Sequence, residues 1–108
     1  MIDWTRVARL REEIGADDFS EVIEVFLEEV EGEIAPLRQP CEPSQLEAVL
    51  HFLKGSALNL GFETFAELCA DGESKAAEGH VAEIDLHAIL KSYSNSKVLF
   101  LDALEHRF

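Results

Sequence analysis

The residues best suited to chemistry are a histidine, a lysine and a glycine within five positions of each other in one predicted helix. They are His51, Lys54 and Gly55. At about 100° per residue, Lys54 and Gly55 fall within about 60° of His51 around the helix axis. The apolar stripe of the same helix lies roughly 140° away from His51. The spacing therefore predicts an exposed patch that combines an imidazole, an ammonium group and bare backbone.

This patch has the groups needed to receive a phosphoryl group. A neutral imidazole is a good nucleophile near pH 7 because its unperturbed pKa is about 6.5, so His51 could attack an aspartyl phosphate. Lys54, one turn further on, could neutralise the phosphoryl oxygens as a mobile point charge. A glycine in mid-helix is destabilising, so Gly55 is expected to let a second protein come close. The chain shows no phosphate-binding glycine loop, so a partner must supply the activated phosphoryl group.

The elements that position this patch are predicted to be helices throughout. Apolar residues recur at spacings of three and four, and no sustained alternation suggests strands. Helices are expected over about 3–14, 18–37, 44–60, 63 or 64 to 78, and from a start within 81–85 to 106. Four long amphipathic helices with short connections imply an all-α, antiparallel four-helix bundle, with the short first helix packed on its side or end. A chain of 108 residues fits one domain, residues 1–108.

Local signals mark several helix ends. Asp18 with Glu21, and Ser44 with Glu47, match the spacing of a capping box, and Gly61 suits a C-terminal cap. Gly72 falls inside the fourth predicted helix, where glycine costs about 1 kcal/mol relative to alanine. The sequence leaves open whether this glycine lets a neighbouring helix approach closely or marks a kink.

Composition narrows the range of partners. The formal net charge of −13 argues against a nucleic acid or an anionic membrane as partner, because both attract positive charge. No apolar run approaches the roughly 20 residues that span a bilayer, and the N-terminus lacks signal-peptide features. We therefore expect a cytoplasmic protein. Cys41 and Cys69 lack metal-type or redox-type spacing and are expected to be free thiols.

One segment carries a family resemblance. The run His51-x-x-Lys54-Gly55-Ser56-Ala57-x-x-x-Gly61 closely resembles the signature of histidine-containing phosphotransfer (HPt) domains. The resemblance covers most of the chain. The parts that look like the family's second and fourth helices are Asp18-Phe19 leading into Phe26-Leu27-Glu28-Glu29, and Gly61-Phe62 followed by Leu68-Cys69 and Glu73.

The resemblance implies a role for each motif residue. His51 would be the phosphoacceptor, Lys54 would stabilise the phosphoryl group and Gly55 would be the position of close approach. Ser56 and Gly61 would be structural. Family members can have a polar residue from the fourth helix that hydrogen-bonds the histidine, and Glu73 is the candidate here. Residue 72, before Glu73, is usually large and apolar in such domains, so its glycine leaves open whether the fourth helix is irregular.

The resemblance also implies the partners. They would be receiver domains of response regulators and hybrid histidine kinases, and the receiver would supply both the aspartate and the Mg²⁺. The chain would hold no metal or other cofactor of its own and would be a phosphoryl carrier rather than an enzyme with an ATP site. Docking is expected to rest on apolar contact around His51, with Leu58 and Phe62 as candidates, Ala48 at the edge and Glu47 in the same patch. A monomer is expected because one core accounts for the apolar residues.

Two other functions stay open on the sequence. The first is a helical bundle that docks a receiver or a kinase without transferring phosphate, which loss of His51 or Lys54 would have favoured. The second is a metal-dependent bundle enzyme, because Glu47 with His51 and Glu83 with His87 are spaced i, i+4. Di-iron bundles instead use Glu-x-x-His, which does not occur in the chain. The remaining histidines are expected at the surface: His80, His87 and His106.

Overall fold

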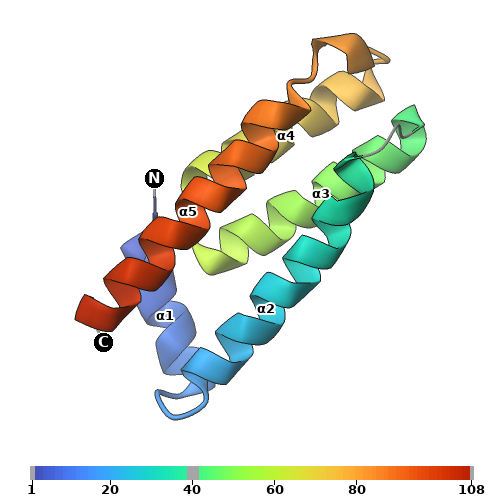
Figure 1. Ribbon diagram of the computed structural model, residues 1–108. Coiled ribbons are helices and arrows are strands. Elements are labelled where there is room, and N and C mark those ends of the chain that lie inside the picture. Colours follow the sequence, from blue (N-terminus) through green and yellow to red (C-terminus); the bar gives the residue numbers. More distant parts are fainter. Residues whose placement is uncertain (1, 39–41, 108) are drawn as a thin grey trace.

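The computed structural model describes residues 2–38 and 42–107, and over these ranges the chain is helical (Figure 1). Its α-helices are α1 (Trp4–Ile14), α2 (Phe19–Ile34), α3 (Pro43–Leu60), α4 (Glu63–Ala77) and α5 (Leu86–Arg107). Two short 3-10 helices, Ala35–Arg38 and Val81–Glu83, follow α2 and precede α5. In this part of the chain the β-structure amounts to one isolated bridge between Ile2 and Phe62. The predicted all-α class is confirmed.

The helices form a bundle in which consecutive long helices run in opposite directions (Figure 1). Helix α3 packs against α4 along its length, while α2 packs on α3 and α5 on α4. The short α1 lies at the end of the bundle where α3 turns into α4. Among the described residues, no helix has the length and apolar character needed to span a bilayer.

Apolar side chains from every α-helix fill the centre of the bundle. The residues with at most 1% exposure include Val7, Val30, Leu46, Leu50, Leu53, Leu60, Phe65, Cys69 and Phe100. At one end the aromatic rings meet: Phe62 packs edge-on against Phe100, with 5.2 Å between ring centroids, and Trp4 stacks on the same ring at 5.9 Å. Such ring pairs contribute beyond the area that they bury, so this cluster ties α1 and α5 to the start of α4.

The turn between α3 and α4 depends on a glycine. Gly61 ends α3 in the left-handed conformation, with φ of +80°, as its sequence position predicted. Its carbonyl accepts a hydrogen bond of 2.7 Å from the amide of Asp3, and a Cβ at this position would lie 2.7 Å from the Asp3 carbonyl oxygen. Any other residue would combine backbone strain with a clash, so the predicted C-terminal cap is confirmed.

The two predicted capping boxes do not form. Asp18 takes the N-cap position of α2, as predicted, but its backbone is helical and its side chain makes no capping hydrogen bond. Helix α3 begins at Pro43, one residue before Ser44, and extended Glu42 takes the N-cap position. Proline favours the first helical position because its φ is preset and its missing N–H would be unsatisfied there anyway. Helix α2 also ends at Ile34 instead of residue 37, and the chain continues as a 3-10 turn through Pro36.

Gly72 lies inside an unbroken α4 and marks no irregularity of this helix. The residue is buried, and a Cβ added to it would lie 3.0 Å from Leu50 Cδ1 and 3.4 Å from Ile89 Cδ1. Of the two alternatives that the sequence left open, the structure supports close approach. Side chains of α3 and α5 press on the α4 backbone at this position.

Cys69 is a free thiol with no exposed surface, in agreement with the sequence. Burial raises the pKa of its thiol to about 12, and the charge of Glu73 acts in the same direction. A thiol with this pKa is inert near neutral pH. Cys41 lies outside the described residues.

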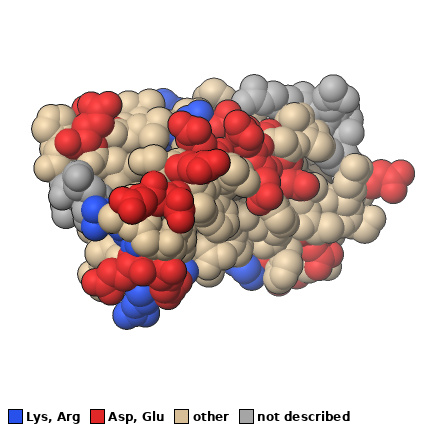
Figure 2. Space-filling view, turned by 90° about the horizontal axis from the view of Figure 1, so that it is seen from below, with Lys and Arg blue, Asp and Glu red and all other residues tan. Residues whose placement is uncertain are grey.

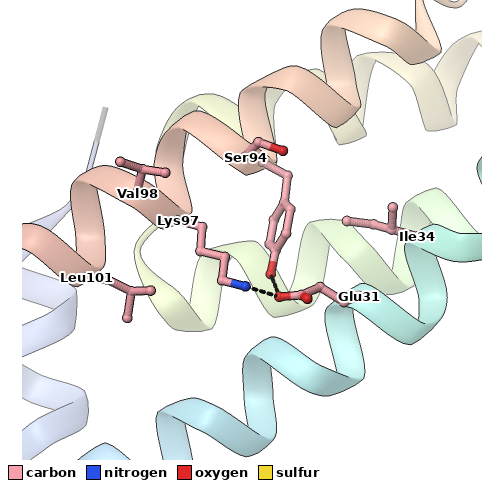
Figure 3. Close-up of a pocket in the computed structure, with 7 residues that line it drawn as sticks. Glu31, Ile34, Ser94, Lys97, Val98 and Leu101 are labelled. Carbon is pink, nitrogen blue, oxygen red and sulfur yellow. Dashed lines mark hydrogen bonds and ion pairs between the residues drawn. The ribbon is translucent and has the colours of Figure 1, made fainter.

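A polar contact joins α2 to α5 away from the α3–α4 pair. Glu31 Oε2 accepts hydrogen bonds from Tyr93 Oη at 2.8 Å and from Lys97 Nζ at 2.6 Å. Figure 3 shows Lys97 reaching from α5 toward Glu31 on α2. Both residues line a groove of about 370 Å³ that Val98 and Leu101 also border. These two hydrogen bonds hold the pKa of the Glu31 carboxyl below its usual value, and the bond from Lys97 has the larger effect.

Candidate functional site

His51 lies on the outer face of α3, as predicted. Its side chain is 69% exposed, whereas its neighbours in the apolar stripe, Leu50 and Leu53, have no exposed surface. The helix therefore anchors itself through one face and presents the imidazole on the other. This arrangement makes the ring accessible to a second protein and keeps its backbone rigid.

A carboxylate from the neighbouring helix joins the two candidate side chains of α3, His51 and Lys54. Glu73 on α4 places Oε1 2.7 Å from His51 Nδ1 and Oε2 2.8 Å from Lys54 Nζ. The side chains of Glu73 and Lys54 are 19% and 32% exposed. The structure thus brings together three residues that the sequence singled out, and Glu73 hydrogen-bonds the histidine as the resemblance implied.

The charge of Glu73 determines which ring nitrogen of His51 is free. The hydrogen bond from Lys54 has the largest effect on the pKa of the Glu73 carboxyl, which it lowers. Burial raises this pKa, and the hydrogen bond from His51 lowers it again. The carboxyl is therefore ionised near neutral pH and only accepts hydrogen bonds. His51 must donate its Nδ1–H to Glu73, which leaves the lone pair of Nε2 directed away from the carboxylate.

The surface beside His51 is open on the side of Gly55. This glycine is exposed, and a Cβ added to it would meet no other atom within 4 Å. Its place in mid-helix is therefore not explained by packing within the bundle. Leu58, two turns beyond His51, is 57% exposed, and Ala48 is exposed while Glu47 is half-buried. Ser56 is half-buried, and its supporting role stays a prediction.

Phe62 is the predicted docking residue that the structure contradicts. It has no exposed surface, because it lies at the start of α4 with its ring in the aromatic cluster beside Phe100. It cannot contact a partner. An exposed apolar side chain that the sequence analysis did not single out is Phe52, which follows His51 and is 40% exposed. Its signal was present, since a step of about 100° from His51 also lies off the apolar stripe.

Metal coordination finds no support in the described ranges, 2–38 and 42–107, where no three His, Cys, Asp or Glu side chains are placed to hold an ion. His51 shares its hydrogen bond with Glu73, on another helix. The other three histidines are exposed, as predicted: His80, His87 and His106. His80 Nδ1 lies 3.2 Å from Glu83 and 3.5 Å from Glu78.

The molecular surface reflects the excess of acidic residues. In the view of Figure 2, acidic side chains are scattered over much of the face and basic side chains are few and separate. With a net charge of −13, the chain is repelled at long range by any partner whose own surface is acidic. The lysine in the site, Lys54, is already bonded to Glu73.

Comparisons with known proteins agree with this geometry. The family model of the Hpt domain matches residues 5–105. The phosphorelay protein LuxU of Vibrio vulnificus, from strains YJ016 and CMCP6, is 30% identical over 105 residues, which covers 86% of this chain and 91% of that protein. No solved structure matches the chain significantly. Because the family match extends over nearly the whole chain and includes every helix of the site, the chain belongs to the Hpt domain family.

Proposed function

We propose that this chain is a histidine phosphotransfer protein of a two-component phosphorelay. His51 accepts a phosphoryl group from the aspartate of a receiver domain, or from a kinase, and passes it to the receiver of a response regulator. Membership of the Hpt family and the likeness to LuxU, which is named a phosphorelay protein, support a phosphotransfer role. The observation that carries the proposal is the Glu73 carboxylate bonded to Nδ1 of an exposed His51, with Nε2 left free.

The transfer step follows from this tautomer. The Nε2 lone pair attacks phosphorus as the bond between phosphorus and the aspartyl oxygen breaks, and the aspartate departs as a carboxylate. No proton has to leave during the step, because Nδ1 keeps its hydrogen and the ring becomes a phosphoimidazolium. The positive charge that develops on the ring lies 2.7 Å from the Glu73 carboxylate, which stabilises it. The reverse sequence returns the phosphoryl group to a second aspartate.

Lys54 and Gly55 serve the incoming group and the incoming protein. Lys54 is one-third exposed on a flexible stem, so its ammonium can turn from Glu73 toward phosphoryl oxygens on Nε2. Gly55 leaves room for the donor's backbone beside the ring. The docking face we propose extends over Glu47, Ala48 and Leu58, with Phe52 taking the place of the buried Phe62.

The chain depends on its partners for the other groups that phosphotransfer needs. The chain acts as a carrier with no ATP site or metal of its own, and the receiver domain contributes both Mg²⁺ and the aspartate. A hybrid histidine kinase lies upstream and a response regulator downstream. The chain acts as a monomer, in which α2, α3, α4 and α5 make up an antiparallel four-helix bundle and α1 is the additional short helix.

The experiment that tests the proposal is transfer from a ³²P-labelled receiver domain. The wild-type chain should take up label that is labile in acid, stable in base and mapped to His51. A His51→Gln variant should take up none, while His87→Gln, which removes an exposed histidine on α5, should behave like wild type. Label on another residue, or equal labelling of His51→Gln, would refute the assignment. A receiver that binds without transferring label would indicate a docking bundle instead.

A further inference from the structure

A groove runs between α3 and α4 directly beside the phosphoacceptor. Residues at helical spacing on the two facing helices form it, with a volume of about 380 Å³: Lys54, Leu58, Glu63, Ala66, Glu67 and Ala70. The small side chains of Ala66 and Ala70 line it on the α4 side; Ala66 is 4% exposed and Ala70 is half-buried. Leu58 stands 57% exposed at its side. The groove is therefore an apolar trough that no residue of the described chain fills.

An exposed acidic side chain, Glu67, lies on the α4 side of the trough. The single cation among the described residues that line the trough is Lys54. Because Lys54 Nζ is bonded to Glu73, little of its positive charge is left to balance Glu67. A side chain that enters this groove would be apolar itself and would be flanked by Lys or Arg.

Distance ties the groove to the transfer site. Leu58 is seven residues beyond His51 on α3, which is about 10 Å along the helix axis. A standard interface covers about 800 Å² on each partner, a patch of about 16 Å radius. An interface of this size centred on His51 would therefore cover the groove as well, and Lys54 belongs to both features.

We infer that this α3–α4 groove selects the partner: it receives an apolar side chain of the docking receiver domain, flanked by a Lys or Arg that faces Glu67. This inference rests on the proposed phosphotransfer function and adds the kind of receiver that the site accepts. A receiver with an acidic residue at that place meets like charge at the rim and loses affinity. Selection by a local basic flank also explains how a chain of net charge −13 can dock a protein whose active site is acidic.

The charge arm of the test uses Glu67→Lys. A panel of purified, phosphorylated receiver domains is screened against the wild type, and the fastest donor is kept. With that donor, Glu67→Lys should slow transfer to His51 about fivefold and weaken its dependence on salt, because rim charges act mainly on the association rate. Glu28→Lys, which changes the net charge equally at an exposed position on α2, should stay within about twofold of wild type.

The shape arm uses Ala70→Leu, which fills the trough without adding charge. Transfer from the same receiver should fall about tenfold, whereas labelling of His51 by phosphoramidate, a donor too small to need docking, should be unchanged. Wild-type rates for both Glu67→Lys and Ala70→Leu would overturn the groove and leave the proposed function standing. Failure of every receiver to label wild-type His51 would refute the proposed function, and the groove with it. A concentration-dependent dimer that Ala70→Leu dissolves would assign the groove to a second copy and overturn the inference.

Discussion

Glu73 Oε1 on α4 lies 2.7 Å from His51 Nδ1 on α3, so one helix decides which ring nitrogen of the other is free to react. Replacing Glu73 by Gln removes the negative charge that stabilises the phosphoimidazolium, and the amide no longer enforces one tautomer. A charge-assisted hydrogen bond contributes roughly 1.5–3 kcal/mol, so transfer to His51 should slow by at least about tenfold. Initial rates measure this effect, and ¹⁵N NMR of the ring reports the tautomer. Unchanged rates with an unchanged tautomer would exclude Glu73 as a positioning residue.

Lys54 is predicted to act on the phosphoryl group rather than on the fold. Its side chain is one-third exposed and its ion pair with Glu73 is open to solvent screening, so the free energy of unfolding of Lys54→Ala should stay within about 1 kcal/mol of wild type. Transfer should nevertheless slow about tenfold, because the phosphoryl oxygens lose their neutralising cation. Lys54→Arg should recover part of the rate. If the loss of transfer rate in the two variants were proportional to their loss of unfolding free energy, this role would be contradicted.

Substitutions of Gly55 should have opposite effects on the stability of the protein and on the rate of transfer. A Cβ at this position meets nothing within 4 Å, so Gly55→Ala should stabilise the protein by about 0.5–1 kcal/mol through helix propensity. Gly55→Gln should keep most of that gain but slow transfer from a receiver, because its side chain occupies the space needed by the partner's backbone. Urea unfolding and receiver transfer measure the two effects. Fast transfer by Gly55→Gln would show that no protein approaches there.

Leu58 tests the docking face. Its side chain is 57% exposed, so Leu58→Glu should leave the free energy of unfolding within about 0.5 kcal/mol of wild type. Transfer from a cognate receiver should slow, since a carboxylate would have to be buried in an apolar contact. Val98→Glu is the matched control, because Val98 is 67% exposed on α5 at the α2–α5 groove. Equal rates for the two variants would remove Leu58 from the interface.

Helical periodicity was enough to predict the all-α class and the outward direction of His51, because both depend on angles within a single helix. It failed at Phe62, which follows the left-handed Gly61: beyond that residue the backbone leaves α3, and angles counted along α3 no longer apply. Glu73 could be named only as a candidate. Its contact with His51 joins residues 22 positions apart, and the register of α4 against α3 depends on packing such as that of Leu50 on Gly72.

The hydrogen bonds of Glu31 should make the free energy of unfolding depend on pH. The folded-state pKa of Glu31 lies below the ordinary value of 4.5, chiefly because of Lys97 and then Tyr93. The stabilisation is therefore complete above about pH 4.5 and is lost as the pH falls through the folded-state pKa. Since the Glu31 side chain is 45% exposed, solvent screening limits the effect to about 1 kcal/mol.

Glu31→Gln should therefore unfold about 1 kcal/mol more easily than wild type at pH 7, and the difference should be smaller at about pH 3. Urea unfolding at the two pH values measures it, with Glu28→Gln, at an exposed position of the same helix, as the control. A deficit of equal size at both pH values would mean that the substitution disturbs packing between α2 and α5 rather than removing a charge. In that case the hydrogen bond from Tyr93 would stabilise the fold only by positioning the Tyr93 ring between the helices.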